Sequence, residues 1–411
     1  MNLEDEIKEA DSYIRTIDWK DAIGSVDPFE TIIRFLGGLV SAYDISHSSI
    51  YLDKAVKLAK ETLTPMMGAA MGACMQKFLI NQGNGYISAA RAGTNWLEFY
   101  RLSQQTNSPE FHDLASKEWE ILINPPVDGP LGKALINGPV ERITGLQLNG
   151  EISFGAEGDS YYEYLIKAWI MAPLTETALY RDRWVEAIET AMRNLSVTTR
   201  EGHTFLAMWK GNHNLEYTFG HLGCFIGGNV VLGARALLRE DFMKWGEELI
   251  AGCHHTYAST PTGLGPECIF PFTCFAKYQV FRFVPADEPL PVLAADQQEQ
   301  LAKWGFWIVD GSYGLRPEVI ESYFYGWRIT GNVKYREWAW DAFLALSLWT
   351  KAEYGHAQLA DVITGQQRQT AQESFWYAET LKYLYLCFDE PERWSLDDWV
   401  FNTGMYNSQL S

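Results

Sequence analysis

The chain has 411 residues, and 47 % of them are hydrophobic, which is enough for a large buried core. Its 33 basic and 52 acidic residues give a net charge of −19, so the surface repels phosphate backbones and we expect no nucleic-acid partner. We expect no membrane span, no signal peptide at the acidic start MNLEDEIKEA and, because the six cysteines lack CxxC spacing, no zinc site.

Helical periodicity dominates the chain, and one two-helix unit recurs along it. In each copy an apolar, aromatic helix ends in a short polar turn, and a second amphipathic helix follows. Copies lie at 35–63, 96–122, 164–192, 229–253 and 323–346, and a partial copy runs from 379–388 into 395–401. Two segments interrupt the pattern and predict long loops: the Gly/Met-rich 64–94 and the Pro-rich 255–300.

Repeated helix pairs bury their apolar faces only against neighbouring pairs, so they stack into an open solenoid or a closed α/α toroid. The first helix of each unit is the more apolar one, which fits an inner ring surrounded by an outer ring. An open solenoid would expose the aromatic inner helices as a large patch. We therefore predict an all-α toroid, formed as a single domain over 1–411.

Carboxylates recur at the N-terminal ends of the predicted inner helices. All inner helices of a toroid point the same way, so these acids should meet in one funnel. Like charges raise one another's pKa and helix N-termini lower it, which can leave one protonated acid and one ionised base, as glycoside hydrolysis requires. The acids are Asp27, Glu30, Glu98, Asp159, Glu163, Glu318, Glu321, Glu373 and Glu379.

Ordinary structural roles also fit several of these residues. Glu30 fits a helix capping box with Arg34 as its i,i+4 partner, and Asp159 fits a helix N-cap. His221 fits a core histidine, Pro317 predicts a common helix start at position N1, and most aromatic rings suit a core. Glu379 is different, because it lies mid-helix among apolar residues, where a buried acid needs partners.

Six sequence blocks in order resemble the class I α-1,2-mannosidases, glycoside hydrolase family 47, over about 27–403. They are FETIIRFLGGLVSAYD, GDSYYEYLIKAW, HLGCF, LRPEVIESYFYGWRITG, ESFWYAETLKYLYL and VFNT. The segment 178–270 resembles the soluble fungal branch. The resemblance implies an (α/α)7 barrel and an inverting, Ca²⁺-dependent enzyme. Its implied activity is to trim terminal α-1,2-linked mannose from high-mannose N-glycans, within or beyond the secretory pathway.

The resemblance also implies roles for single residues. Glu30 matches the general acid, Glu318 the general base, Asp159 a third acid and Thr403 the threonine that binds Ca²⁺. Four residues match acids that line the family's sugar and metal site and act there largely through water molecules: Glu318, Glu321, Glu373 and Glu379. Cys224 and Cys253 match a disulfide. Substrate-contacting positions are matched by Arg34, Glu98, His221, Arg316, Glu321, Phe375 and Glu379.

Three departures from the family pattern leave alternatives open. The chain starts late, with about six helix pairs instead of seven, which predicts a missing first pair and an exposed apolar seam. Segment 64–94 lacks a Gly-Ile-Pro-Tyr-like turn. Thr403 is followed by Gly-Met-Tyr instead of Glu-Ala-His. A catalytically impaired glycan-recognition or quality-control protein, or an α/α-toroid glycosidase acting on another sugar, therefore remain as alternatives.

Overall fold

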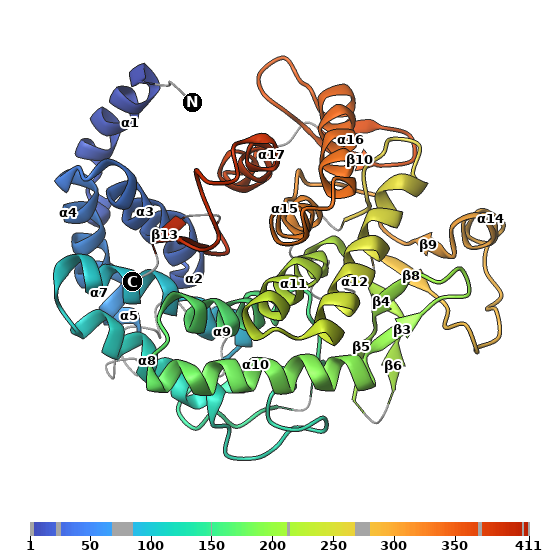
Figure 1. Ribbon diagram of the computed structural model, residues 1–411, viewed down its shortest axis with the longest axis horizontal. Helices are drawn as coiled ribbons and strands as arrows, with labels where there is room; N and C mark the ends of the chain where they lie inside the picture. The colour runs from blue at the N-terminus through green and yellow to red at the C-terminus, as the bar shows by residue number, and fades with distance from the viewer. Residues whose placement is uncertain are drawn as a thin grey trace.

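The structure is a computed structural model that describes residues 4–21, 26–67, 85–148, 150–211, 214–267, 280–368, 372–404 and 407–409. Its helices form a ring of antiparallel pairs, with an inner helix and an outer helix in each pair (Figure 1). This arrangement confirms the predicted α/α toroid. The five complete pairs of the described residues are α3 (Gly37–Ser46) with α4 (Ser49–Leu58), α7 (Trp96–Thr106) with α8 (Glu110–Ile123), α9 (Asp159–Met171) with α10 (Thr175–Asn194), α11 (Phe225–Leu237) with α12 (Glu240–Ser259), and α15 (Glu318–Thr330) with α16 (Lys334–Trp349).

Helix α11 is one of the two most completely buried inner helices of the described pairs. Every residue of α11 from Phe225 to Ala234 is buried, whereas α10 buries only one stripe. The packing of the Trp184 ring, from α10, against α11 depends on Gly233, where an added Cβ would lie 2.1 Å from that ring. The Trp184 indole also donates to Asn229 Oδ1 on α11 at 2.8 Å, so packing and a buried hydrogen bond fix this pair together.

The last repeat departs from the prediction. Its inner helix is α17 (Leu381–Phe388), preceded by the π-helical η8 (Trp376–Thr380), but the predicted second helix over 395–401 is wrong. Residues Trp399–Phe401 form strand β12, antiparallel to β13 (Asn407–Gln409). The β-branched and aromatic sequence Trp-Val-Phe suits a strand, and the ring of Phe401 packs 5.4 Å from that of Phe324. Strand β12 contacts the inner helix α9.

Parts of both predicted loops are regular structure, so the loop predictions are wrong for those parts, whereas 260–267 and 284–294 are irregular as predicted. In 64–94, residues 68–84 lie outside the described residues, and the rest holds α5 (Thr64–Met67), β1 (Tyr86–Ile87) and α6 (Ala89–Gly93). In 255–300, α12 continues to Ser259, and β8 (Phe281–Phe283) and the start of α14 (Ala295–Trp304) follow. Local composition missed β8 because its pairing partners, β7 (Thr218–Phe219) and β9 (Phe306–Ile308), are distant in sequence.

The remaining strands form two-stranded antiparallel sheets at the ends of helices. These pairs are β1 with β2 (Val140–Glu141), β3 (Ser196–Thr198) with β4 (Thr204–Leu206), β5 (Met208–Trp209) with β6 (Leu215–Glu216), and β10 (Gln358–Asp361) with β11 (Gln366–Arg368). Four short helical segments complete the described elements: η1 (Trp19–Asp21), α2 (Pro28–Thr31), η2 (Ile32–Leu36) and η7 (His221–Cys224). The π-helical η3 (Ala59–Leu63) extends α4.

Helix α1 (Glu4–Thr16) packs on α4, where the Tyr51 hydroxyl donates to Asp11. In the part of the chain that the structure describes, no helix covers the outer side of α17 (Figure 1). An exposed apolar seam lies nearby: Trp340 is 48 % exposed and Leu348 72 %, and the rings of Trp340 and Phe388 lie 5.7 Å apart. The described residues hold no helix long and apolar enough to cross a membrane.

A disulfide joins Cys224, at the start of α11, to Cys253 in α12, which confirms the implied pairing. We predict that replacing both cysteines by alanine lowers the free energy of unfolding by roughly 3.5 kcal/mol, because the 29-residue loop no longer restricts the unfolded chain. Urea unfolding of the variant and of the wild type checks this. A reductant should lower the wild-type midpoint and leave the variant's unchanged. Equal midpoints for variant and oxidised wild type would contradict it.

Candidate active site

A cavity of about 450 Å³ opens where the inner helices begin. Its size is that of a typical ligand pocket. Nine acidic side chains and three arginines line it, so its charge is strongly negative. Seven of the nine acids predicted for the funnel are among these side chains, whereas Asp27 and Glu98 are not. The acids are Glu30, Glu157, Asp159, Glu163, Glu267, Glu318, Glu321, Glu373 and Glu379, and the arginines are Arg34, Arg91 and Arg316. His221, Phe375 and Thr403 line it as well.

One wall of the cavity is the start of α2 and the π-helical η2. Asp27 is the N-cap of α2, and its carboxylate accepts from the Phe29 amide at 3.0 Å, as the capping interpretation predicted. Glu30 nonetheless lines the cavity, where it accepts from Arg34 Nε at 2.6 Å. The N-cap at Asp27 is confirmed, and the catalytic role of Glu30 stays a prediction. The π-turn fits a functional site, since such turns concentrate there.

Phe375 connects this wall to the next one. The guanidinium of Arg34 lies 5.6 Å from the centroid of its ring, and that of Arg316 lies 4.7 Å away. Both distances fit cation–π contacts. Phe375 therefore joins Arg34 and Arg316 in the cavity lining.

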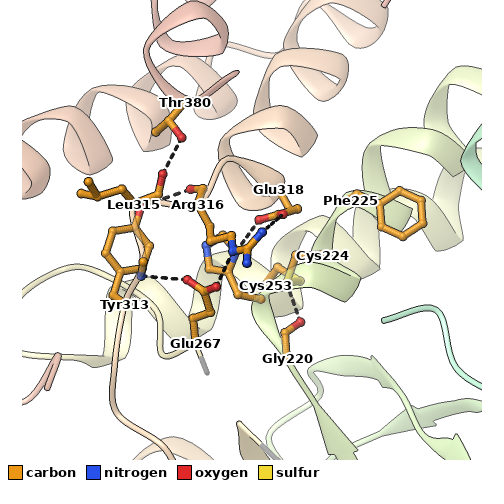
Figure 2. A network of polar contacts seen from close by, with 12 residues as sticks. Gly220, Cys224, Phe225, Cys253, Glu267, Tyr313, Leu315, Arg316, Glu318 and Thr380 are labelled. Carbon is orange, nitrogen blue, oxygen red and sulfur yellow. Dashed lines mark hydrogen bonds and ion pairs between the residues drawn. A yellow bond between two sulfur atoms is a disulfide. The ribbon is translucent and has the colours of Figure 1, made fainter. Parts of the chain in front are cut away.

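The second wall is the turn before α15 (Figure 2). Leu315 adopts the left-handed conformation, φ 66°, and the Thr380 hydroxyl donates to its carbonyl at 2.6 Å. A non-glycine residue in this conformation is held only by its surroundings. Pro317 is the N-cap of α15 instead of the predicted N1 residue, and Glu318 is the first helical residue. The turn therefore presents Arg316 and Glu318 to the cavity.

Glu267 is a site residue that the sequence analysis missed. It is 2 % exposed, accepts from the Gly314 amide at 2.8 Å and forms an ion pair with Arg316 Nε (Figure 2). It lies in the segment predicted as a loop, and an acid ending the Gly/Pro-rich run TGLGPE was the available signal. Glu267 clamps the guanidinium of Arg316, which also lies 3.9 Å from Glu318.

His221 is buried, as a core histidine would be, yet it also lines the cavity. It belongs to η7, just before the disulfide-linked Cys224. Its Nδ1 lies 2.9 Å from Glu318 Oε2. Glu318 therefore has two basic neighbours, His221 and Arg316, on the side of its carboxylate that faces the protein.

The floor of the cavity holds a buried ion-pair network. Lys167 of α9 is fully buried, contacts Glu163 at 2.5 Å and lies 3.9 Å from Glu321. Glu321 also accepts from the Tyr383 hydroxyl at 2.9 Å. A buried lysine between two carboxylates holds them in place and offsets part of their repulsion.

Burial dominates the pKa values of the floor acids. Desolvation raises the pKa of Asp159 to about 7, and repulsion from Glu157, Glu163 and Glu318 adds to it. Desolvation, followed by repulsion from Glu163, raises the pKa of Glu321 to about 8. The pKa of Glu379 is also raised well above its ordinary value, first by burial and then by Glu318 and Glu321. Asp159 and Glu321 can therefore hold protons near neutral pH.

We predict that the metal-free protein becomes less stable as pH rises from about 4 to about 8. A carboxyl group whose pKa is higher in the folded than in the unfolded state binds more protons when the protein is folded. Its contribution to the free energy of unfolding is therefore lost as the pH rises from the unfolded-state pKa to the folded-state pKa. For Asp159 the window runs from 3.8 to about 7. Each pKa unit corresponds to about 1.4 kcal/mol.

Urea unfolding in EDTA at pH 5 and pH 8 measures this loss. The Asp159→Asn variant lacks one carboxyl group with a raised pKa. The free energy of unfolding of the variant should therefore change less between the two pH values than that of the wild type. Equal pH dependence in the variant and the wild type would show that Asp159 titrates alike in the folded and unfolded chains.

Thr403 reaches the cavity at the end of β12, and its position depends on Glu98. The Thr403 amide donates to the Tyr164 hydroxyl at 3.2 Å, and that hydroxyl donates to Glu98 at 2.6 Å. Asn402 also donates to Glu98 at 2.6 Å. Glu98 is 1 % exposed and does not line the cavity. The implied substrate contact of Glu98 stays a prediction, and the contacts that the structure gives Glu98 are with Tyr164 and Asn402, beside Thr403.

The donor set near Thr403 suits a hard cation. Threonine and carboxylate oxygens are the ligands that Ca²⁺ prefers, and the excess of acids leaves negative charge to be neutralised. Glu98 Oε2 is buried without a hydrogen-bond partner in the described structure. Within the described ranges no cluster of three or more Asp, Glu, His or Cys side chains is close enough to bind a metal directly. A cation here would need Thr403 and water as its nearest ligands.

A ring of paired helices around an acid-lined pocket defines the class as an α/α-toroid glycoside hydrolase. The model of Glycosyl hydrolase family 47 matches residues 1–405, and the chain belongs to this family. It is 37 % identical to mannosyl-oligosaccharide alpha-1,2-mannosidase 1B of Emericella nidulans, covering 97 % of this chain and 79 % of that protein. It is 35 % identical to the Aspergillus oryzae 1B protein, covering 100 % and 80 %.

A solved structure agrees with the fold. The alpha-1,2-mannosidase from Trichoderma reesei superposes with a TM-score of 0.88 at 29 % sequence identity. The match covers 99 % of this chain and 87 % of that one. The sequence-based expectation of the family, with its fungal branch, is confirmed.

Proposed function

We propose that the protein is an inverting, Ca²⁺-dependent α-1,2-mannosidase that removes terminal mannose from high-mannose N-glycans in the secretory pathway. One observation carries the proposal: Glu30, Asp159, Glu318 and Thr403, which are far apart in sequence, line a single acidic cavity. The relatives' names, mannosyl-oligosaccharide alpha-1,2-mannosidases, support the same linkage and sugar.

Inversion needs one acid and one base on opposite sides of the sugar. Glu318 acts as the base that takes a proton from water, because Arg316 at 3.9 Å and His221 at 2.9 Å hold its carboxylate in place at the cavity. Glu30 acts as the acid that protonates the leaving oxygen, and Asp159 is the third acid. A water must fit between base and sugar, so their carboxyl groups should lie roughly 6.5–9.5 Å apart.

Calcium, when bound, would supply a template for sugar hydroxyls and electrostatic stabilisation. Thr403, through its hydroxyl and carbonyl oxygens, would hold it, and Glu318, Glu321, Glu373 and Glu379 would reach it through water. Phe375 and the two arginines beside it would orient the substrate at the rim.

Linkage preference tests the proposed activity. The protein is incubated in Ca²⁺ with the disaccharides Man-α-1,2-Man, Man-α-1,3-Man and Man-α-1,6-Man, and free mannose is measured. We expect release from the α-1,2 disaccharide alone. Release of another sugar from aryl glycosides, with none from mannosides, would favour a different toroid glycosidase.

A catalytically impaired glycan-binding protein is the second candidate. It is favoured by one feature, Gly404 after Thr403, which places no carboxylate next to the proposed metal ligand. High-mannose glycan binding in a titration, with no mannose release at any Ca²⁺ concentration, would support this candidate over the enzyme.

A further inference from the structure

One motif of the sequence takes no part in the cavity chemistry. Asn194-Leu195-Ser196 matches the acceptor pattern for N-glycosylation, which is Asn-x-Ser/Thr with any residue except proline in the middle. No other asparagine in the sequence meets this pattern. A three-residue pattern arises easily by chance, so the fold around it decides whether the asparagine can carry a glycan.

The motif is anchored at its middle residue and open at its first. Asn194 is the last residue of α10 and is exposed, as is Arg193 before it. Leu195 is 0 % exposed and belongs to the hydrophobic core. The buried leucine fixes the backbone where α10 ends and β3 begins, and Asn194 faces solvent at that point. A glycan on Asn194 would therefore extend into solvent without displacing core residues.

The Asn194 side chain can accept a sugar and keep its own hydrogen bond. Its amide nitrogen carries two hydrogens, and the nitrogen donates to the Thr190 carbonyl at 2.9 Å. In N-glycosylation this nitrogen forms a bond to C1 of the first sugar, while the bond from C1 to the diphosphate of a lipid-linked oligosaccharide breaks. The lipid diphosphate leaves, and the transferase takes up one amide proton. The second hydrogen remains available to Thr190.

Ser196 also has a structural role, which the experiment must separate from glycosylation. It is the first residue of β3, and its hydroxyl accepts from the Trp245 indole at 2.9 Å. Ser196→Thr keeps both the hydroxyl and the acceptor pattern, whereas Ser196→Ala removes both. Asn194→Gln removes the acceptor pattern and leaves the contact with Trp245 intact.

The attachment point lies beside the cavity wall. Ser196 pairs with Leu206 in the β3–β4 sheet, and the Ala207 amide donates to the Leu195 carbonyl at 2.8 Å. Leu206 and Ala207 both line the cavity. A glycan on Asn194 would therefore be attached next to a strand that belongs to the cavity lining.

We propose that Asn194 is an N-glycosylation site and that its glycan stands beside the cavity wall at the end of α10. The inference rests on the secretory-pathway location in the proposed function, because a lipid-linked donor and its transferase are met there. The attached oligosaccharide belongs to the same class of glycan that the protein is proposed to trim.

Translation of the full chain with microsomal membranes tests this site. A secretory leader fused before Met1 supplies entry, and protection from added protease selects the molecules that have entered. We expect one glycan on the wild type, seen as a single mobility shift that an endoglycosidase for high-mannose glycans reverses. Asn194→Gln and Ser196→Ala should lose the shift, and Ser196→Thr should keep it.

A second acceptor pattern is the matched control. Lys334→Thr places a hydroxyl two residues after Asn332, which is exposed in the turn before α16. Added to Asn194→Gln, this substitution should restore a single shift. The restored shift would show that Asn194→Gln enters the membranes and meets the transferase, so that its own lack of a shift is due to the missing asparagine.

Three results would overturn the inference: a protease-protected wild type without a shift, a shift that persists in Asn194→Gln, or a glycan that is released only after denaturation. Mannose release from Man-α-1,2-Man is measured on the same samples. An active protein without a glycan would contradict the inference alone. A glycosylated, folded protein that releases no mannose would contradict the proposed activity alone.

Discussion

Glu318→Gln should lower kcat for Man-α-1,2-Man by roughly 10²- to 10⁴-fold, the range that acid–base catalysis contributes. The amide keeps the size of the side chain but cannot accept a proton from water. Arg316 and His221, which contact Glu318 at 3.9 and 2.9 Å, should hold it in nearly the same place, so KM should change little. Initial rates of mannose release measure both constants.

Glu337→Gln is the control for this substitution. Glu337 belongs to the outer helix α16 and is exposed, far from the cavity lining, so its rate should match the wild type. Circular dichroism and the unfolding midpoint show that Glu318→Gln is folded. A folded Glu318→Gln protein with at least a tenth of the wild-type kcat would rule out Glu318 as the base.

Removal of Ca²⁺ by EDTA should lower mannose release on the order of 100-fold, because a bound cation supplies several kcal/mol of transition-state stabilisation. The same ion should stabilise the fold, by about 2.7 kcal/mol when its concentration is 100 times its Kd. The reason is electrostatic: nine acids and only three arginines line the cavity. Unfolding midpoints in EDTA and in Ca²⁺ give a readout that does not depend on activity.

Thr403→Val tests the metal ligand, because it removes the hydroxyl at nearly constant size. The variant should lose most of the Ca²⁺-induced stabilisation. Thr364→Val, at an exposed threonine between β10 and β11, should keep it. Equal Ca²⁺ stabilisation in both variants would show that the cation does not bind through the Thr403 hydroxyl.

Much of the fold was predictable from the sequence because the helix pairs repeat. Helix α11 is apolar on most sides, whereas α10 is apolar along one stripe only. This difference can be read from the sequence of each helix, so hydrophobic periodicity alone separates inner from outer helices. The strands were not predictable in this way. Trp399–Phe401 was predicted as helix, although its pairing with Asn407–Gln409 and its contact with Phe324 make it a strand.

The candidate site also contains residues that the sequence could place and residues that it could not. Glu30, Asp159 and Glu318 start helices, and a toroid brings such starts together, so their convergence followed from topology. Glu267 could not be placed, because its role depends on the turn at Gly314 and Arg316, 47 and 49 residues away. Glu98 starts a helix as well, yet it lies behind the wall, because side-chain packing and not sequence decides its exposure.

The anomer of the first mannose released tests the central account most directly. Proton NMR follows the cleavage of Man-α-1,2-Man by the wild-type protein in Ca²⁺, before the product mutarotates. A single displacement by water, activated by Glu318 and aided by Glu30, predicts that β-mannose appears first and that Glu318→Gln gives almost none. α-Mannose as the first product, or no mannose from the folded protein, would contradict it.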